Sequence, residues 1–382
     1  MLGIFFLKNK AGVMGVENNY LSYLKWRGDL SFQEYSFNEI DNIILSELAY
    51  FRFDHIIPCD DKIITIKAAY DKLERMNKKH KKAGLFSPSI STLQRIAQSP
   101  RFAHLMLSHY VNKYDEKNMQ FAAMKICIDE NLNYVAFRGT DDTLTGWKED
   151  FSISFEIVPS QKEASTYLDQ VLDIKKQNIV GGHSKGGHLA VYGAMMCNDT
   201  LKSCISKIYS NDGPGVCQEL IDMRKYEMIK DKIIKIIPEF SVVGLLFEKL
   251  DNPQLKIVKS NNKGILQHDP LNWQVNCQTF VEGKIINQAY ICNTIFDEWI
   301  GNVDMKDRHV FVNDLFDALS VKCAKTLTDL SNQGVSCFED ILNSIVHSQK
   351  KSKQVFVKLL KSTFNRIKNI DYLKLFKEKE FL

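Results

Sequence analysis

A serine framed by glycines is the feature of this sequence whose residue types and spacing could do chemistry. The run Gly182-His183-Ser184-Lys185-Gly186-Gly187 follows the apolar pair Ile179-Val180 and opens a helical pattern that continues to Met196. A serine at a sharp turn from strand to helix is held in strained backbone angles that expose its hydroxyl oxygen. Glycines two residues before and after it remove Cβ atoms that would collide as strand and helix pack. The pattern predicts that Ser184 is a nucleophile for acyl transfer.

A second motif, Phe137-Arg138-Gly139-Thr140, closes an apolar run that begins at Tyr134. Acyl transfer requires hydrogen-bond donors aimed at the developing oxyanion. One donor is the backbone N–H after the nucleophile, here that of Lys185, and the other comes from a loop after an earlier strand. Thr140 offers both an N–H and a hydroxyl at the end of such a strand. We therefore expect Thr140 and the Lys185 N–H to form an oxyanion hole.

The charged residues beside these motifs have simpler interpretations. A cation at Lys185 could contact an anionic substrate, but we expect its side chain to extend into solvent. Arg138 and Asp150 are expected to be structural partners rather than catalytic groups.

The elements that must position these residues alternate between strands and helices. Apolar runs at 121–128 and 133–137, separated by Asp129-Glu130-Asn131, predict a β-hairpin. Further strands are expected at 179–180, 205–210, 232–237 and 255–259, with helices at 162–176 and 185–196. This alternation predicts an α/β domain with a mainly parallel central sheet. Helices are expected within 37–53, 61–82 and 89–107, as a lid-like N-terminal region, and again beyond about 287.

The combined motifs resemble the lipase-like α/β-hydrolases related to class three (fungal-type) lipases, and are closest to a bacterial branch of unknown function. The residues that carry the resemblance are Phe137-Arg138-Gly139-Thr140, Trp147, Asp150, the Ser184 run, Trp26-Arg27-Gly28-Asp29, Asn211-Asp212-Gly213-Pro214-Gly215 and Gln267-His268-Asp269. The resemblance implies an α/β-hydrolase fold, serine ester-hydrolase chemistry and Thr140 in the oxyanion hole. The predicted domains are residues 18–300, the hydrolase domain with its N-terminal helical region, and 303–382, an added C-terminal helical appendage.

The general base is expected among the four histidines that follow Ser184, because the base comes last in the chain order of this fold. His188 is fixed on the helix that follows the serine and should not reach back to it. His309 and His347 fall in the helical appendage. His268 alone lies in a loop after a predicted strand, so we assign it as the base.

The acid that would orient His268 is open to three interpretations. Asp212 follows the strand 205–210, beside glycines that permit a tight turn, and we favour it. By resemblance, class three lipases carry the acid after the next strand in an Asp-x-Val-Pro context. This chain has Ser241-Val242-Val243-Gly244 there, with Glu239 two residues earlier. Glu239 and then Asp269 are the alternatives.

Composition and charge indicate which class of protein carries these motifs. The chain has 382 residues and a net charge of only +4, too little for a nucleic-acid-binding footprint. Residues 350–382 hold ten Lys/Arg against three Asp/Glu, so the basic character belongs to the tail. Its apolar positions recur at helical spacing, which predicts a helix docked on the core; contact with an anionic membrane is the alternative.

Nine cysteines without a Cys-x-x-Cys pair indicate reduced thiols in a cytoplasmic protein. Met14 is an alternative start to Met1.

Taken together, the sequence predicts a serine hydrolase that cleaves a carboxylic ester, either a lipid or a small acyl ester, through an acyl-enzyme intermediate. No metal or organic cofactor is implied. The alternative is a non-catalytic binding or scaffold protein that retains the hydrolase fold, an interpretation supported by the missing Asp-x-Val-Pro acid.

Overall fold

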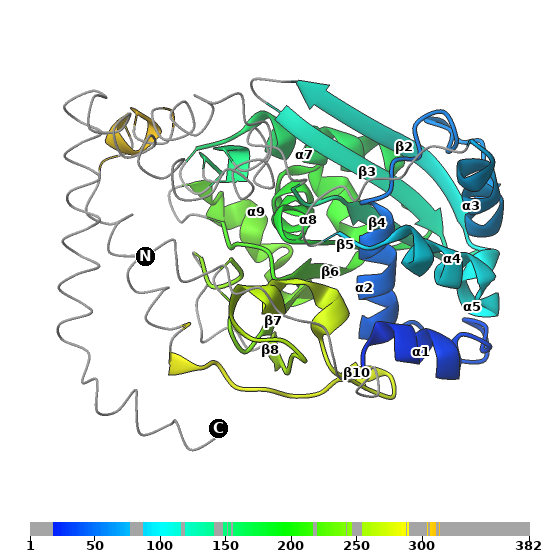
Figure 1. Ribbon diagram of the computed structural model, residues 1–382. Helices are drawn as coiled ribbons and strands as arrows, with labels where there is room; N and C mark the ends of the chain where they lie inside the picture. The colour runs from blue at the N-terminus through cyan, green and yellow to red at the C-terminus, as the bar shows by residue number, and fades with distance from the viewer. Residues whose placement is uncertain are drawn as a thin grey trace, which may run out of the picture. The chain divides into compact units, whose positions relative to one another are not determined.

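The protein is described by a computed structural model, shown in Figure 1. The described residues are 18–76, 87–115, 119–140, 148–150, 152–153, 156–216, 220–241, 243–246, 254–287, 289, 304, 306–310 and 313. The chain divides into two compact units, Met1–Ala289 and Tyr290–Leu382, and the motifs identified above fall in the first. The basic tail at 350–382, Trp147 and His347 lie outside the described residues. The predicted domain boundaries stay predictions.

The central element is an eight-stranded sheet whose strands lie in chain order from β1 to β8. The strands are β1 (Ile64–Thr65), β2 (Met106–Asp115), β3 (Met119–Cys127), β4 (Leu132–Phe137), β5 (Gln177–His183), β6 (Ile205–Asn211), β7 (Ile233–Pro238) and β8 (Leu255–Val258). Neighbours from β1 to β4 are antiparallel and neighbours from β4 to β8 are parallel. The mainly parallel sheet and the β3–β4 hairpin are therefore confirmed.

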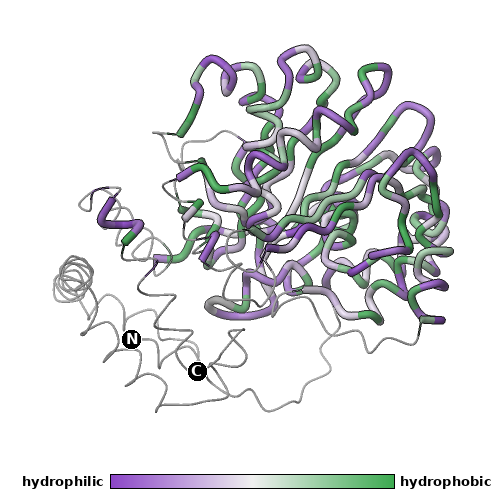
Figure 2. Tube along the Cα trace, turned by 90° about the horizontal axis from the view of Figure 1, so that it is seen from above, coloured by the Kyte–Doolittle hydropathy of each residue, from purple (hydrophilic) through white to green (hydrophobic). Residues whose placement is uncertain are grey.

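Helices cover both faces of this sheet (Figure 1). They are α1 (Tyr20–Arg27), α2 (Glu39–Leu48), α3 (Ile66–Arg75), α4 (Ile90–Gln98), α5 (Pro100–Ala103), α7 (Pro159–Val171), α8 (Lys185–Met196) and α9 (Met223–Glu227). Short 3₁₀ turns include Gly264–His268 and Pro270–Asn272, and β9 (Val275–Asn276) pairs with β10 (Thr279–Phe280). Hydrophobic stretches run through the strands and helices of the packed core (Figure 2).

Alternation along β4 divides the core into two layers. Tyr134 and Ala136 belong to the cluster that contains α1 to α4, whereas Val135 and Phe137 belong to the cluster that contains α7 and α8. Successive side chains of a strand point to opposite faces. The parallel strands β4, β5 and β6 follow one another in one direction. Since crossovers between parallel strands are almost always right-handed, α7 and α8 are expected on the same face, and they share one cluster. The opposite face is left for the N-terminal helices.

The N-terminal region differs from the expected lid. All ten residues of α2 are buried, and its apolar side chains pack in the same cluster as Tyr134. The predicted lid-like arrangement is therefore wrong for α2, because the sheet needs this helix to cover its second face. The sequence patterns also missed several elements, among them α1 and β2. Buried and exposed residues do not alternate regularly along β2, so the strand lacks a clear two-residue period.

Candidate active site

Ser184 occupies a sharp turn between β5 and α8. Its backbone angles are φ 56° and ψ −130°, a left-handed conformation that costs of order 1–3 kcal/mol in a non-glycine residue. A Cβ on Gly182 would collide with the Gly186 backbone, and one on Gly186 would collide with the Phe137 carbonyl. The glycines therefore permit β4, β5 and α8 to meet closely. The strained turn predicted from the sequence is present, and with the mainly parallel sheet it gives the chain the α/β-hydrolase fold.

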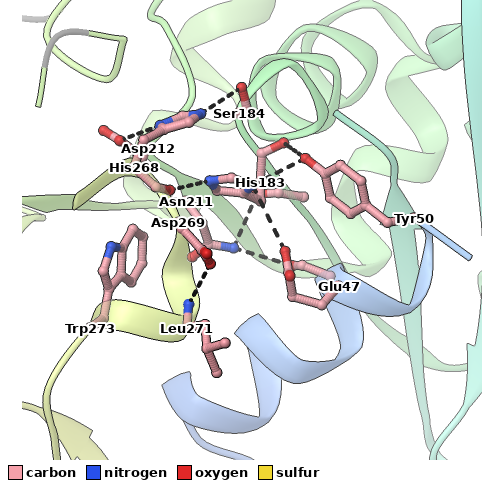
Figure 3. Close-up of polar contacts among 12 residues, drawn as sticks. Glu47, Tyr50, His183, Ser184, Asn211, Asp212, His268, Asp269, Leu271 and Trp273 are labelled. Atoms are coloured by element: carbon pink, nitrogen blue, oxygen red, sulfur yellow. Dashed lines mark hydrogen bonds and ion pairs between the residues drawn. The ribbon is translucent and has the colours of Figure 1, made fainter. Parts of the chain in front are cut away.

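His268 lies between Ser184 and Asp212 in a continuous chain of hydrogen bonds (Figure 3). The His268 Nε2 is 3.0 Å from the Ser184 Oγ, and the His268 Nδ1 is 2.6 Å from the Asp212 Oδ2. A carboxylate accepts hydrogen bonds, so the proton of a neutral imidazole lies on Nδ1 and Nε2 is free to accept from the serine. The three side chains come from different parts of the chain. The structure brings the residues assigned from the sequence, Ser184, His268 and Asp212, together in one row.

Asp212 is held from several directions at the end of β6. It is buried and has φ 46°, and its N–H donates to the Ile236 carbonyl at 2.7 Å. The Ser241 hydroxyl donates to its Oδ1. Ser241 occupies the position where, by resemblance, the class three lipases carry their acid. In this chain the residue at that position instead donates to a carboxylate that follows the neighbouring strand.

The alternative acids have other contacts in the structure. The Glu239 Oε1 accepts from the Lys284 N–H at 3.3 Å, and the Asp269 Oδ1 accepts from the Leu271 N–H at 2.9 Å as the cap of a 3₁₀ turn. His188, which we excluded as the base, is buried and its Nε2 is 2.8 Å from the Gln161 Nε2. Burial lowers the pKa of His188 to about 4.

Thr140 lies just beyond β4, and Phe137 of that strand pairs in register with Gly182 of β5. Its hydroxyl hydrogen-bonds to the Asp150 Oδ2. Burial raises the pKa of Asp150 to about 6, while the Lys185 ammonium acts in the opposite direction. Asp150 is thus a structural partner, as expected from the sequence, and it holds the side chain of Thr140, the predicted oxyanion donor.

Lys185 corrects an expectation, because its side chain is buried rather than extended into solvent. Its Nζ lies 2.9 Å from the Glu149 Oε2, 3.0 Å from the Gln120 carbonyl oxygen and 3.9 Å from the Asp150 Oδ1. These partners come from β3 and from the segment at 148–150, so the ion pair ties that segment to the start of α8. A buried ammonium requires such partners to compensate its lost hydration.

The Lys185 N–H is at the first position of α8. The first four N–H groups of an α-helix lack intrahelical partners and carry the positive end of the helix dipole. This N–H is therefore suited to an anion beside Ser184. The other predicted structural partner, Arg138, is buried and donates to the Asn112 Oδ1 at 3.0 Å.

Three polar residues around this row were not identified from the sequence, namely Ser241, His183 and Tyr50. His183 precedes the nucleophile, and its Nε2 is 2.8 Å from the His268 carbonyl oxygen. Tyr50 follows α2, and its hydroxyl is 3.0 Å from the His183 Nδ1. The only signal for His183 was its place inside the glycine-rich turn, and Tyr50 had none because it is 133 residues away from its partner.

The described part of the chain contains no group of three His, Cys, Asp or Glu side chains arranged to hold a metal ion. None of the helices there has the length and apolar character needed to cross a membrane.

No curated protein matches the chain. Among solved structures, the chain is similar to one titled "Crystal structure of M37 lipase", with 15% sequence identity, a TM-score of 0.29 and coverage of 53% of this chain and 68% of that one. The model of the Mbeg1-like family matches residues 96–317, which is more than half of the sequence and includes Thr140, Ser184, Asp212 and His268. The lipase-like fold expected from the motifs is thus confirmed, and the chain belongs to the Mbeg1-like family.

Proposed function

We propose that this protein is a serine hydrolase that cleaves a carboxylic ester, of a lipid or of a small acyl compound, through an acyl-enzyme intermediate. One observation carries the proposal: the Ser184 Oγ, the His268 imidazole and the Asp212 carboxylate form a hydrogen-bonded row with distances of 3.0 and 2.6 Å. Nucleophile, base and orienting acid at these separations are the arrangement that activates a serine hydroxyl.

In the proposed acylation step, the Ser184 Oγ attacks the ester carbonyl carbon while the His268 Nε2 takes the hydroxyl proton. Asp212 stabilises the resulting imidazolium through its Oδ2. Collapse of the tetrahedral intermediate breaks the bond to the alkoxy group, which takes the proton from Nε2 and leaves as the alcohol. A water molecule then attacks the acyl-enzyme by the same sequence of proton transfers and releases the carboxylic acid.

Oxyanion stabilisation is assigned to Thr140 and to the backbone N–H of Lys185. Both groups lie at the carboxyl edge of the parallel strands, beside the nucleophile turn. Pre-placed donors aimed at a developing negative charge contribute about 2.7–4 kcal/mol each to transition-state stabilisation. The contact between Thr140 and Asp150 fixes the threonine side chain before substrate binds.

The alternative of a non-catalytic binding or scaffold protein rested on the absence of the acid that class three lipases carry after the next strand. The proximity of Asp212 to the His268 Nδ1 argues against this alternative, because a buried carboxylate already occupies the orienting position. We therefore favour the interpretation that the protein is an enzyme.

Active-site labelling tests the proposal directly. An activated Ser184 should react with a fluorophosphonate probe under native conditions, and Ser184→Ala should not. Ser165→Ala is a matched control on α7, where the serine hydroxyl donates to the Lys162 carbonyl, and it should label like the wild type. His268→Ala should abolish labelling and the turnover of short-chain nitrophenyl esters. Native wild-type protein that neither labels nor turns over these esters would contradict the proposal.

A further inference from the structure

His183 is a second buried histidine that lies directly beneath the proposed base (Figure 3). It is the last residue of β5, and its side chain is 1% exposed. Its ring centroid is 4.6 Å from that of His268. The His183 Nε2 approaches the His268 carbonyl oxygen rather than the His268 ring nitrogens. His183 therefore contacts the backbone of the proposed base and not its ring nitrogens.

The partners of His183 determine its tautomer. The His268 carbonyl oxygen can only accept a hydrogen bond, so the His183 Nε2 carries a proton. In a neutral imidazole the Nδ1 is then an acceptor, which suits donation from the Tyr50 hydroxyl at 3.0 Å. The buried Glu47 carboxylate also faces this nitrogen, but its Oε1 is 3.8 Å away, beyond hydrogen-bond distance. Burial, and then the charge of a protonated His268, lower the pKa of His183 well below its usual value. Burial raises the pKa of Tyr50, which keeps its proton for donation.

Tyr50 also contacts the segment that follows β4 and leads to Thr140. Its hydroxyl lies against the backbone of Gly139. A Cβ on Gly139 would collide with that hydroxyl and would come 2.6 Å from the His183 carbonyl oxygen. The glycine that precedes Thr140 is thus required for the close approach of Tyr50. One hydroxyl connects the strand end that carries Thr140 with the histidine that supports the base.

The adjoining carbonyl of the same turn is held in a similar way. The Trp273 Nε1–H donates to the Gln267 carbonyl at 2.8 Å, and the Trp273 ring packs edge-on to the His183 ring. The Gln267 side chain accepts from the Phe240 N–H at 2.9 Å. Two consecutive carbonyls, of Gln267 and His268, therefore accept from ring N–H groups. A turn fixed at both carbonyls has little freedom to move the base.

We propose that His183 is a positioning residue: its Nε2–H holds the His268 carbonyl, and Tyr50 fixes the tautomer that makes this possible. The inference rests on the proposed function, in which His268 is the base. A displacement of about 1 Å at a reacting group can cost about 100-fold in rate. The hydrogen bond to the carbonyl keeps the His268 Nε2 within 3.0 Å of the Ser184 Oγ.

Two substitutions at His183 separate hydrogen bonding from packing. His183→Gln places an amide N–H near the position of Nε2 but loses the ring, whereas His183→Phe keeps a ring and loses the donor. We expect kcat for a nitrophenyl ester to fall about 100-fold in His183→Phe and no more than about tenfold in His183→Gln, with KM little changed in both. If packing alone mattered, His183→Phe would be the more active variant, and this order would overturn the proposal.

A measurement on unmodified protein covers the case in which a variant does not fold. Nitrogen NMR of wild-type protein with labelled histidine should show a ring that stays neutral from pH 5 to 8 with its proton on Nε2. His188 should also stay neutral, but with its proton on Nδ1, which faces the Pro214 carbonyl oxygen. Tyr50→Phe identifies the His183 ring, because the shift of its unprotonated nitrogen should change. A His183 ring protonated on Nδ1, or one that titrates in this range, would overturn the proposal. A wild type that fails to label would instead count against the proposed function, and NMR would still decide the tautomer.

Discussion

The Asp150→Asn variant should gain stability relative to the wild type as the pH rises. Burial raises the pKa of Asp150 to about 6 in the folded protein, against about 3.9 for an aspartate in an unfolded chain. The folded state therefore holds this proton more tightly than the unfolded state. The stability contributed by the proton is fully present below about pH 4 and is lost as the pH rises through about 6. Asparagine is neutral at every pH in this range, so the variant does not lose stability in this way.

The size of the effect follows from the shift. A difference of about two pKa units at about 1.36 kcal/mol per unit corresponds to about 3 kcal/mol. The side chain of Asp150 is 21% exposed, so solvent screening makes this an upper figure. The amide introduced by Asp150→Asn would also retain a hydrogen bond to the Thr140 hydroxyl. The free energy of unfolding of Asp150→Asn, relative to wild type, should thus increase by about 2–3 kcal/mol between pH 4 and pH 8.

Urea unfolding at 25 °C, measured for both proteins at several pH values, tests this prediction. Asp129→Asn is the matched control, because Asp129 is exposed in the turn between β3 and β4. Its difference curve shows what the removal of an exposed carboxylate contributes by itself. A difference curve for Asp150→Asn that is flat, or that falls with rising pH, would refute the reasoning that burial dominates the Lys185 charge at this carboxyl.

Three further substitutions test the site. Asp212→Asn should lower kcat for a nitrophenyl ester about 10⁴-fold, because an amide N–H facing the His268 Nδ1 selects the wrong tautomer; an unchanged kcat would contradict the role of the acid. Ser241→Ala removes a hydrogen bond to the Asp212 carboxylate and should lower kcat about 10–100-fold without loss of folding. Lys185→Met leaves the Glu149 carboxylate buried without its ammonium, so urea unfolding should show a loss of about 3–5 kcal/mol. Adding Glu149→Gln should recover part of this loss, and no recovery would show that the pair is not coupled.

The parts of the site that could be predicted are those defined by short stretches of sequence. The turn at Ser184 depends on glycines within two residues of it, and helix α8 has the bounds Lys185–Met196 that its pattern indicated. The choice of His268 needed only the chain order of the fold and the position of each histidine in a loop or helix. The turn and the helix could be predicted because their backbone conformation is determined locally, whereas the role of His268 as the base stays a prediction.

The contacts that could not be predicted join distant segments. The Lys185 side chain finds its partners at Gln120 and Glu149, which lie 65 and 36 residues away, so the sequence around the serine could not indicate burial. Tyr50 reaches His183 only because α2 covers the face of the sheet that α7 and α8 leave open. A prediction of that contact requires the layer order of the whole domain.

The proposed acid, Asp212, illustrates how a chemical role can be kept while its position in the sequence changes. By resemblance, class three lipases place the acid after the strand that corresponds to β7, whereas Asp212 follows β6. The two strands are parallel neighbours, and the Asp212 N–H donates to Ile236 of β7. Residues that follow adjacent parallel strands therefore emerge at the same edge of the sheet. Ser241, which follows β7, bonds to the same carboxylate. Because catalysis requires an oxygen near the His268 Nδ1 rather than a particular residue number, either strand can supply it. The absence of the Asp-x-Val-Pro motif is for that reason no evidence against a hydrolase.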